Sequence, residues 1–298
     1  MTGTGVIPHP TGWHRRAPLH PYFVCDVFTS QPMQGNQLGV FVDGRPFGPE
    51  EMQRLAREMN LAETVFVLPP NAGGDVSVRI FTPGRELPFA GHPVLGTAFV
   101  VGAALEADSV TLETGAGPVP IVLERDGDRI VFGRMQQSIP TWEAFDRIDE
   151  LLDALNLKAS ELPVEVYHNG PTHVYVELAS EQAVAEVKPN MAALTELDVG
   201  TNCFAGRGRT WKTRMFYPAA GVAEDPATGS AAGPLAVHLA RHGQIDFGEE
   251  IEIRQGEEIG RPSRLYARAV GTPGRVEAVE VGGSAVIVAE GSFRISET

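Results

Sequence analysis

Two stretches of the chain resemble one another, and this internal repeat constrains the fold more than any other feature. The first runs from Phe81 to Ala98 and the second from Phe216 to Leu235. Each passes from a strand-like Phe-x-Pro end, through a polar loop with a carboxylate, to a glycine followed by a polar residue, and then into small and apolar residues. The repeat predicts two related halves with the same local architecture.

The apolar runs that end the two copies predict buried helices. Val94 to Leu105 is apolar on every side, and Ala231 to Ala240 is similar. Because a helix that is apolar all round is a buried helix, each half is expected to wrap a sheet around one central helix. Pro93 suits the first position of a helix, which would make His92 the N-cap.

The starts of these two helices give the first functional signal. Gly91-His92 and Gly229-Ser230 stand where backbone N–H groups have no partner within the helix and where the helix dipole favours an anion. Two such helix ends facing each other would form a cleft suited to a carboxylate. For the bodies of the helices, ordinary core packing is the simpler interpretation.

Charge and motif content exclude several classes of partner. The net charge of -14 at pH 7, with no run of lysine or arginine, argues against nucleic acid and anionic membrane. No stretch is long and apolar enough to span a bilayer. Neither the G-x-G-x-x-G nor the G-x-x-x-x-G-K-[ST] pattern occurs, so neither dinucleotides nor ATP are indicated. The expected partner is a small molecule.

The cysteine content indicates a reduced, cytoplasmic protein. Only Cys25 and Cys203 occur, which excludes a disulfide-rich scaffold and gives no zinc pattern. Reduced thiols in the cytosol are the default for such a chain. Cys25 stands in a strand-like run, so we expect a buried, inert thiol.

Further along the chain, helical and strand-like patterns are mixed. Residues 1–20 have no apolar core suited to a signal peptide and are expected to form a loose extension. A polar turn, Thr29–Leu38, either contacts a ligand or simply connects two strands of a hairpin. After the second central helix the chain is rich in strands. The pattern predicts an α+β fold with a first half, 21–130, completed by a last strand, 284–298, and a second half, 131–283.

Glu63 lies where a helix ending at Asn60 gives way to a strand. On spacing alone such a glutamate is more often a solvated turn residue than a catalytic one. Longer segments of the chain change this balance. They are, in order, Asp26–Thr29, Met59–Phe66, Arg79–Pro83, Glu86–Pro93, Glu224–Ala231 and Gly260–Ser263.

These segments resemble the PhzF-like phenazine-biosynthesis family, over a match from about residue 22 to about residue 294. The resemblance implies the diaminopimelate-epimerase-like fold, with two related halves, each a mainly antiparallel sheet around a central helix, and an active site between them. This agrees with the internal repeat. Relatives are commonly dimers, so a homodimer is expected.

The founding member of that family isomerises trans-2,3-dihydro-3-hydroxyanthranilate by moving a proton along the conjugated ring system, without metal or organic cofactor. Its catalytic glutamate corresponds to Glu63, and the histidine of its first loop to His92. The aspartate of its second loop corresponds to Asp225, and the serine that opens its second helix to Ser230. The resemblance therefore implies the same set of roles here, with no metal and no cofactor.

The chemistry of these residue types fits such a reaction. A carboxylate that takes a proton from carbon and returns it elsewhere must be partly desolvated, so that its basicity rises toward the working pH. Glu63 is the candidate for that carboxylate, and His92 and Asp225 would polarise or orient the hydroxyl and amino groups. Ser230 and the backbones of Gly91 and Gly229 would hold the substrate carboxylate.

Three other functions are alternatives to the isomerase that the resemblance implies. Ala62 stands where the phenazine enzyme has a serine, which removes one hydroxyl and leaves open an isomerase or epimerase of another small amino acid. Two-thiol racemases of this fold place a cysteine at each helix start, where this chain has Ala90 and Thr228, so racemisation by two thiols is disfavoured. A non-catalytic small-molecule-binding protein with the same fold is disfavoured, because burying so many polar groups without use costs stability.

Overall fold

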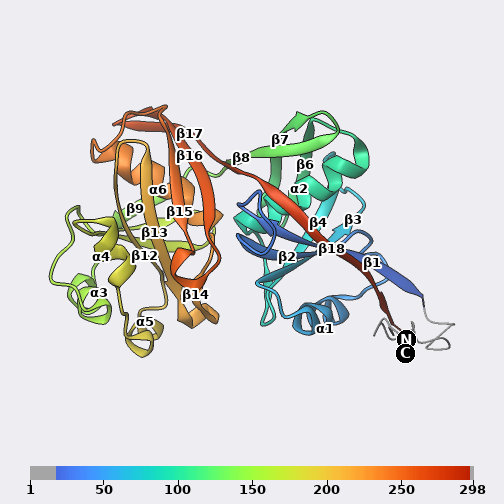
Figure 1. Cartoon of the computed structure of the whole chain (residues 1–298), viewed down its shortest axis with the longest axis horizontal. Coiled ribbons are helices and arrows are strands. Elements are labelled where there is room, and N and C mark those ends of the chain that lie inside the picture. Colours follow the sequence, from blue (N-terminus) through green and yellow to red (C-terminus); the bar gives the residue numbers. More distant parts are fainter. Residues whose placement is uncertain (1–17, 296–298) are drawn as a thin grey trace, which may run out of the picture.

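The computed structural model describes residues 18–295 and has two lobes side by side (Figure 1). Helix α2 (Gly91–Leu105) lies within one lobe and helix α6 (Gly229–Arg241) within the other. The predicted extension 1–20 falls mostly outside the described residues, and β1 begins at Leu19. No helix of the described residues is long and apolar enough to cross a membrane.

The first lobe holds these elements: β1 (Leu19–Val27), β2 (Asn36–Phe41), α1 (Pro49–Met59), β3 (Glu63–Leu68), β4 (Val76–Phe81), β5 (Glu86–Leu87), α2, β6 (Ser109–Thr114), β7 (Gly117–Asp126) and β18 (Ala285–Arg294). Strand β8 (Arg129–Gln137) links the lobes. The second lobe holds β9 (Thr141–Ala144), α3 (Ile148–Leu155), β10 (Glu165–His168), β11 (Thr172–Glu177), α4 (Glu181–Glu186), α5 (Met191–Leu197), β12 (Gly200–Arg207), β13 (Thr210–Tyr217), β14 (Val222–Asp225), α6, β15 (Glu250–Gln255), β16 (Ser263–Thr272) and β17 (Arg275–Gly283).

The strand pairings of the two lobes correspond one for one, which confirms the predicted repeat. The parallel pair β2–β3 in the first lobe matches β11–β12 in the second, and the parallel pair β4–β6 matches β13–β15. The antiparallel pairs β3–β4 and β12–β13 match in the same way. Antiparallel strand pairs dominate both lobes, and each lobe encloses one helix. The fold is therefore α+β, as predicted.

Both central helices are buried, as their sequences predict. Every residue from Gly91 to Gly102 in α2 is buried, and so is every residue from Gly229 to Ala240 in α6. The predicted start of α2 is wrong by two residues. Ala90 is the N-cap, so His92 lies inside the first turn and Pro93 occupies the third helical position.

Two connections tie the lobes together. Strand β8 pairs antiparallel with β7 on one side and with β17 on the other. Strand β18 then returns from the second lobe and pairs with β1 along the whole of that strand. The guanidinium of Arg261 adds a side-chain link, donating to the carboxylate of Asp26 at 2.7 Å. The division of the chain near residue 130 stays a prediction.

Candidate active site

The first turns of α2 and α6 touch where the lobes meet. A Cβ atom on Gly91 would lie 2.8 Å from both the carbonyl carbon of Gly229 and the backbone nitrogen of Ser230. Real Cβ atoms do not approach backbone so closely, so a glycine is needed at this position. The two helix starts that the repeat singles out are thus brought into direct contact.

Glu63 and His92 form the centre of this region. Glu63 is the first residue of β3, and its Oε2 lies 2.9 Å from Nε2 of His92 in α2. The His92 side chain is 6% exposed and the Glu63 side chain 13%. The two atoms are close enough for an ion pair, and neither has any other polar partner in the described part of the chain. Glu63 is therefore not the solvated turn residue that spacing alone favours.

Asp225, the last residue of β14, is held by two side chains. Nδ2 of Asn36 donates to its Oδ1 at 2.8 Å, and the hydroxyl of Thr228 donates to its Oδ2 at 2.5 Å. The same Asn36 amide donates to the carbonyl of Ala227 at 3.0 Å and lies 3.2 Å from Nδ1 of His92. Asn36 therefore joins the histidine of one lobe to the aspartate loop of the other.

Asn36 was not predicted as a site residue. It lies in the polar turn Thr29–Leu38, for which both a ligand contact and a plain hairpin connection were open. The turn does connect two paired strands, β1 and β2. In addition, the side chain of Asn36 reaches the junction of the lobes, and the sequence signal for this was the polar character of the turn.

Polar atoms with few partners gather at this junction. Among the described residues, the buried Asn36 Oδ1 lacks a hydrogen-bond partner, and Glu63 Oε2 and His92 Nε2 have no polar partner other than each other. Buried polar atoms are nearly always fully paired, so such a group within one site is unusual. Such atoms are suited to bind the polar groups of a small molecule.

The electrostatics of the site raise the pKa values of two of its groups. Burial raises the pKa of Asp225 to about 6; the positive charge of His92 opposes this rise and the charge of Glu63 adds to it. Burial alone would lower the pKa of His92, but the Glu63 carboxylate, together with Asp225, outweighs burial and raises it above its usual value. Groups that titrate near the working pH are suited to acid–base chemistry.

The first turn of α6 is fixed by side chains of the second lobe. Pro234 has no N–H, so the carbonyl of Ser230, four residues earlier, loses its usual helical donor. The Asn169 amide lies 3.5 Å from that carbonyl, and Gln137 donates to the carbonyl of Gly229 at 2.9 Å. The hydroxyl of Ser230 lies 3.0 Å from Nε2 of His173, a residue that sequence reasoning did not single out.

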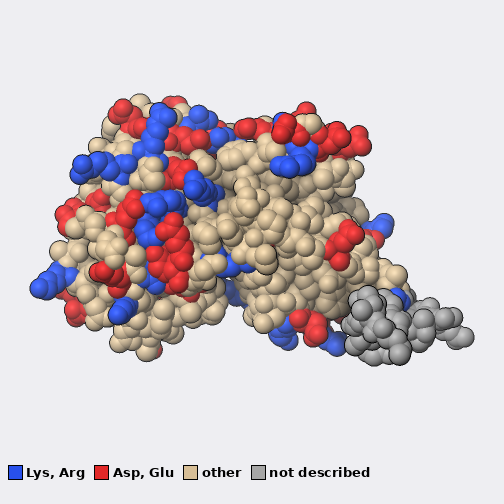
Figure 2. Space-filling view, viewed as in Figure 1, with Lys and Arg blue, Asp and Glu red and all other residues tan. Residues whose placement is uncertain are grey.

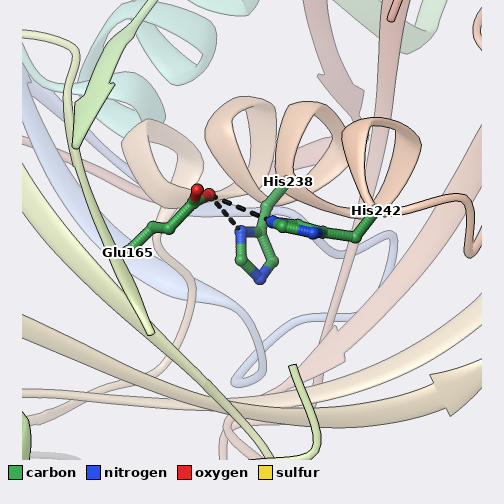
Figure 3. A group of neighbouring side chains, drawn as sticks. All are labelled: Glu165, His238 and His242. Carbon is green, nitrogen blue, oxygen red and sulfur yellow. Dashed lines mark hydrogen bonds and ion pairs between the residues drawn. The ribbon is translucent and has the colours of Figure 1, made fainter. Parts of the chain in front are cut away.

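A second polar cluster lies at the far end of α6 (Figure 3). Glu165 Oε2 lies 3.2 Å from both Nδ1 of His238 and Nε2 of His242, a group of donors with spacing suited to a metal ion. However, the Arg241 guanidinium donates to the same oxygen at 2.6 Å and supplies the balancing positive charge. Among residues 18–295, the other ring nitrogen of His238 has no hydrogen-bond partner, although ligating histidines normally fix that nitrogen with a second hydrogen bond. The cluster is therefore a buried ion-pair network.

A cavity of about 470 Å³ lies between the lobes, but it is distinct from the polar cluster of Glu63. Its lining comes from the turn after β1 and from the β15–β17 region, and includes Phe28, Arg264 and Ser284. None of Glu63, His92, Asp225 and Ser230 belongs to that lining. On the face shown in Figure 2, acidic and basic side chains are interspersed over the second lobe and form no continuous basic patch.

The fold and the site together define a two-lobed α+β protein with acid–base groups at the contact between its central helices. The chain belongs to the phenazine biosynthesis-like (PhzC-PhzF) family, whose model matches residues 25–291. It is 57% identical to the trans-2,3-dihydro-3-hydroxyanthranilate isomerase of Pseudomonas aeruginosa over 274 residues. The match covers 92% of this chain and 99% of that protein.

Solved structures show the same fold. The phenazine biosynthesis protein of the PhzF family from Bacillus anthracis is 27% identical and has a TM-score of 0.83, covering 93% of this chain and all of that one. A hydroxyproline epimerase from Agrobacterium vitis is 12% identical, with a TM-score of 0.68 and coverage of 94% and 93%. At that identity the likeness concerns the fold alone, and it agrees with the epimerase-like architecture that the sequence predicts.

Proposed function

We propose that this protein is an isomerase that moves a proton within trans-2,3-dihydro-3-hydroxyanthranilate by general acid–base catalysis. The Pseudomonas aeruginosa relative, matched over 99% of its length, is named for that substrate. The observation that carries the proposal is the pair of Glu63 and His92, a half-buried carboxylate and a buried imidazole 2.9 Å apart whose facing atoms have no other polar partner in the described residues. Such a pair can exchange a proton with a substrate that binds against it.

In this proposal Glu63 takes the proton from a ring carbon and returns it to another. His92, whose pKa is raised, carries a proton further into the neutral range and donates it to a polar group of the substrate. Asp225 accepts hydrogen bonds from Asn36 and Thr228 on one side and orients the substrate amino or hydroxyl group on the other. General acid–base catalysis of this kind contributes roughly 10²–10⁴-fold to a rate.

The carboxylate of the substrate is assigned to the contact between the helix starts. The N–H groups of the first turns of α2 and α6, opened by Gly91 and Gly229, are of the kind that binds anions. The hydroxyl of Ser230 would add one side-chain donor. Because Gly91 already lies against the backbone of Gly229, the anion binds beside this contact.

Another small amino acid as substrate is the second candidate, since Ala62 replaces the serine of the phenazine enzyme. The side chain of Ala62 is exposed, whereas Glu63, His92 and Asp225 are buried or half-buried. The missing hydroxyl therefore leaves the buried contacts of the site intact. We therefore expect proton transfer to be retained. A different substrate would be accommodated at the exposed edge of the site, where Ala62 lies.

We further propose that the protein acts in the cytoplasm as a homodimer, with no nucleic acid or membrane partner. Cys25 and Cys203 are both buried free thiols, and burial raises the pKa of each to about 12, as the predicted inert role of Cys25 requires. The net charge of -14 disfavours anionic partners. Light scattering of the purified protein tests the dimer, for which a mass of about twice 32.0 kDa is expected.

The test of the isomerase uses purified protein in deuterated water with trans-2,3-dihydro-3-hydroxyanthranilate. We expect isomerisation with incorporation or migration of deuterium at ring carbon, followed by NMR. Glu63→Gln should lower the rate by at least about 10²-fold, because an amide cannot take a proton from carbon at neutral pH. The control is Glu58→Gln, which changes an exposed glutamate of α1 and should leave the rate unchanged.

Two results would contradict the proposal. Deuterium exchange that is equally fast in Glu63→Gln would remove Glu63 from the reaction. Tight binding of the substrate without any exchange would indicate a non-catalytic binding protein. If exchange occurs with another small amino acid but not with this substrate, the proton transfer stands and the substrate assignment is wrong.

A further inference from the structure

The hydroxyl of Ser230 has one side-chain partner among the described residues, the imidazole of His173. Nε2 of His173 lies 3.0 Å from Oγ of Ser230. His173 is 1% exposed and Ser230 7%, so water does not compete freely for this contact. His173 belongs to β11 and Ser230 to the first turn of α6, 57 positions later, and only the folded chain brings them together.

The position of the His173 ring is set by its neighbours on β12. A Cβ atom on Gly200 would lie 2.6 Å from Nδ1 of His173, so only glycine leaves room for the ring. Asn202 places its Nδ2 atom 3.5 Å from the same Nδ1. That amide donates to the carbonyls of Val174 and Gly200, each at 3.2 Å, which fixes its orientation.

This arrangement selects one tautomer of His173. The amide nitrogen of Asn202 cannot accept a hydrogen bond, so a hydrogen on Nδ1 would find no acceptor there, and the hydrogen of the neutral ring belongs on Nε2. Burial also lowers the pKa of His173 to about 4, which keeps the ring neutral at the working pH. Nε2–H then donates to Oγ of Ser230, and the hydroxyl hydrogen of Ser230 is left to donate to another group.

Other side chains hold the backbone of this turn. Gln137 donates to the carbonyl of Gly229, and the hydroxyl of Tyr175 donates to the carbonyl of Ala231 at 2.7 Å. The backbone is thus fixed independently of His173. What His173 sets is the direction of the Ser230 hydroxyl.

We propose that His173 is a positioning residue that makes the Ser230 hydroxyl a hydrogen-bond donor to the carboxylate of the substrate. The inference rests on the proposed function, in which Ser230 helps to bind that carboxylate. Hydrogen bonds to ionised acceptors are the strong ones. A donor that is oriented before the substrate arrives also costs less ordering on binding.

The test is a set of steady-state kinetics with trans-2,3-dihydro-3-hydroxyanthranilate on His173→Leu, Ser230→Ala, the double variant and His173→Gln. We expect His173→Leu to raise KM about tenfold, with a smaller change in kcat, as for loss of one charge-assisted hydrogen bond. In the Ser230→Ala background the same substitution should cost nothing further. The amide nitrogen of glutamine can take the place of Nε2, so His173→Gln should restore most of the affinity.

Tyr175→Phe is the matched structural control, because it removes a donor to the same turn without touching Ser230. It should lower Tm, and any effect on KM should be the same in both Ser230 backgrounds. If the cost of His173→Leu is also the same in both backgrounds, or if His173→Gln restores nothing, His173 acts only on the fold and the inference is wrong.

Nitrogen-15 NMR of the free protein tests the inference independently of any substrate. We expect His173 to be neutral at pH 7 with its hydrogen on Nε2, and a hydrogen on Nδ1 or a charged ring would overturn the inference. Failure of the proposed function looks different: the wild type would not turn over the substrate, or Ser230→Ala would leave KM unchanged, whatever the tautomer of His173.

Discussion

Nδ2 of Asn36 donates a hydrogen bond to the carboxylate of Asp225 at 2.8 Å, across the junction between the two lobes. The two residues are 189 positions apart in the chain. The bond holds a carboxyl whose pKa burial raises to about 6. Its strength therefore depends on pH, because an ionised oxygen accepts more strongly than a neutral carboxyl does.

Asp225→Asn is expected to stabilise the protein at pH 8 while it abolishes most of the activity. The folded state binds the Asp225 proton more tightly than the unfolded state, so stability falls as pH rises from about 4 to about 6 and stays lower above that window. Asparagine does not ionise, and the free energy of unfolding should rise by about 1–3 kcal/mol at pH 8.

Urea unfolding of the wild type and Asp225→Asn at pH 5 and pH 8 measures this difference. The exposed Asp126→Asn in β7 is the control and should show no such pH dependence. A loss of stability in Asp225→Asn at pH 8 would mean that the ionised carboxylate is favourable in the fold.

Gly91→Ala should destabilise the protein and slow the reaction together. The new Cβ would meet the backbone of Gly229 and Ser230 at 2.8 Å, and backbone cannot move aside as a flexible side chain does. Overpacking of this kind typically costs about 1–3 kcal/mol. Thermal unfolding and the isomerase rate are the measurements. Gly274→Ala, in a turn where no atom lies within 4 Å of the new methyl group, should change neither.

Glu165→Gln should lower stability strongly at neutral pH and by a smaller amount at pH 3.5. Burial would raise the pKa of Glu165, but hydrogen bonds from His238, Arg241, His242 and Tyr167 outweigh it and hold the pKa well below its usual value. The carboxylate therefore contributes its full stability above its usual pKa of 4.5, and this contribution declines progressively as pH falls from that value toward the much lower folded-state pKa.

The variant leaves the Arg241 charge without its partner, and breaking a buried ion pair in this way costs about 3–5 kcal/mol. Urea unfolding at pH 7 and pH 3.5 compares the two conditions, with the exposed Glu124→Gln in β7 as control. An equal loss at both pH values would point to shape rather than charge. If added Zn²⁺ raised the Tm of the wild type but not of Glu165→Gln, the cluster would bind metal instead.

The internal repeat predicted the fold correctly, because the repeat can be recognised within continuous segments of the sequence. The apolar runs after Gly91 and Gly229 identify the buried helices without any knowledge of the partner strands. The exact start of α2 was wrong, because a proline fits several positions in the first turn of a helix and Pro93 proved to occupy the third.

Most of the polar contacts across the site could not be predicted from the sequence. Glu63 and His92 were named from a resemblance, and no local pattern gives the 2.9 Å between them. Asn36 and His173 were missed because the site residues they contact, His92 and Asp225 for the first and Ser230 for the second, lie 56 or more positions away. A side chain that acts through such a distant neighbour leaves no periodic signal in its own segment.

Strand β18 has a consequence for how the protein is made. It follows every element of the second lobe in the chain, yet it supplies the strand beside β1 in the first lobe. Domains generally begin to fold in the order in which the ribosome releases them. Here the first lobe emerges with one edge of β1 uncovered and keeps it so until translation has passed residue 285, so a nascent chain is open to mispairing at that edge.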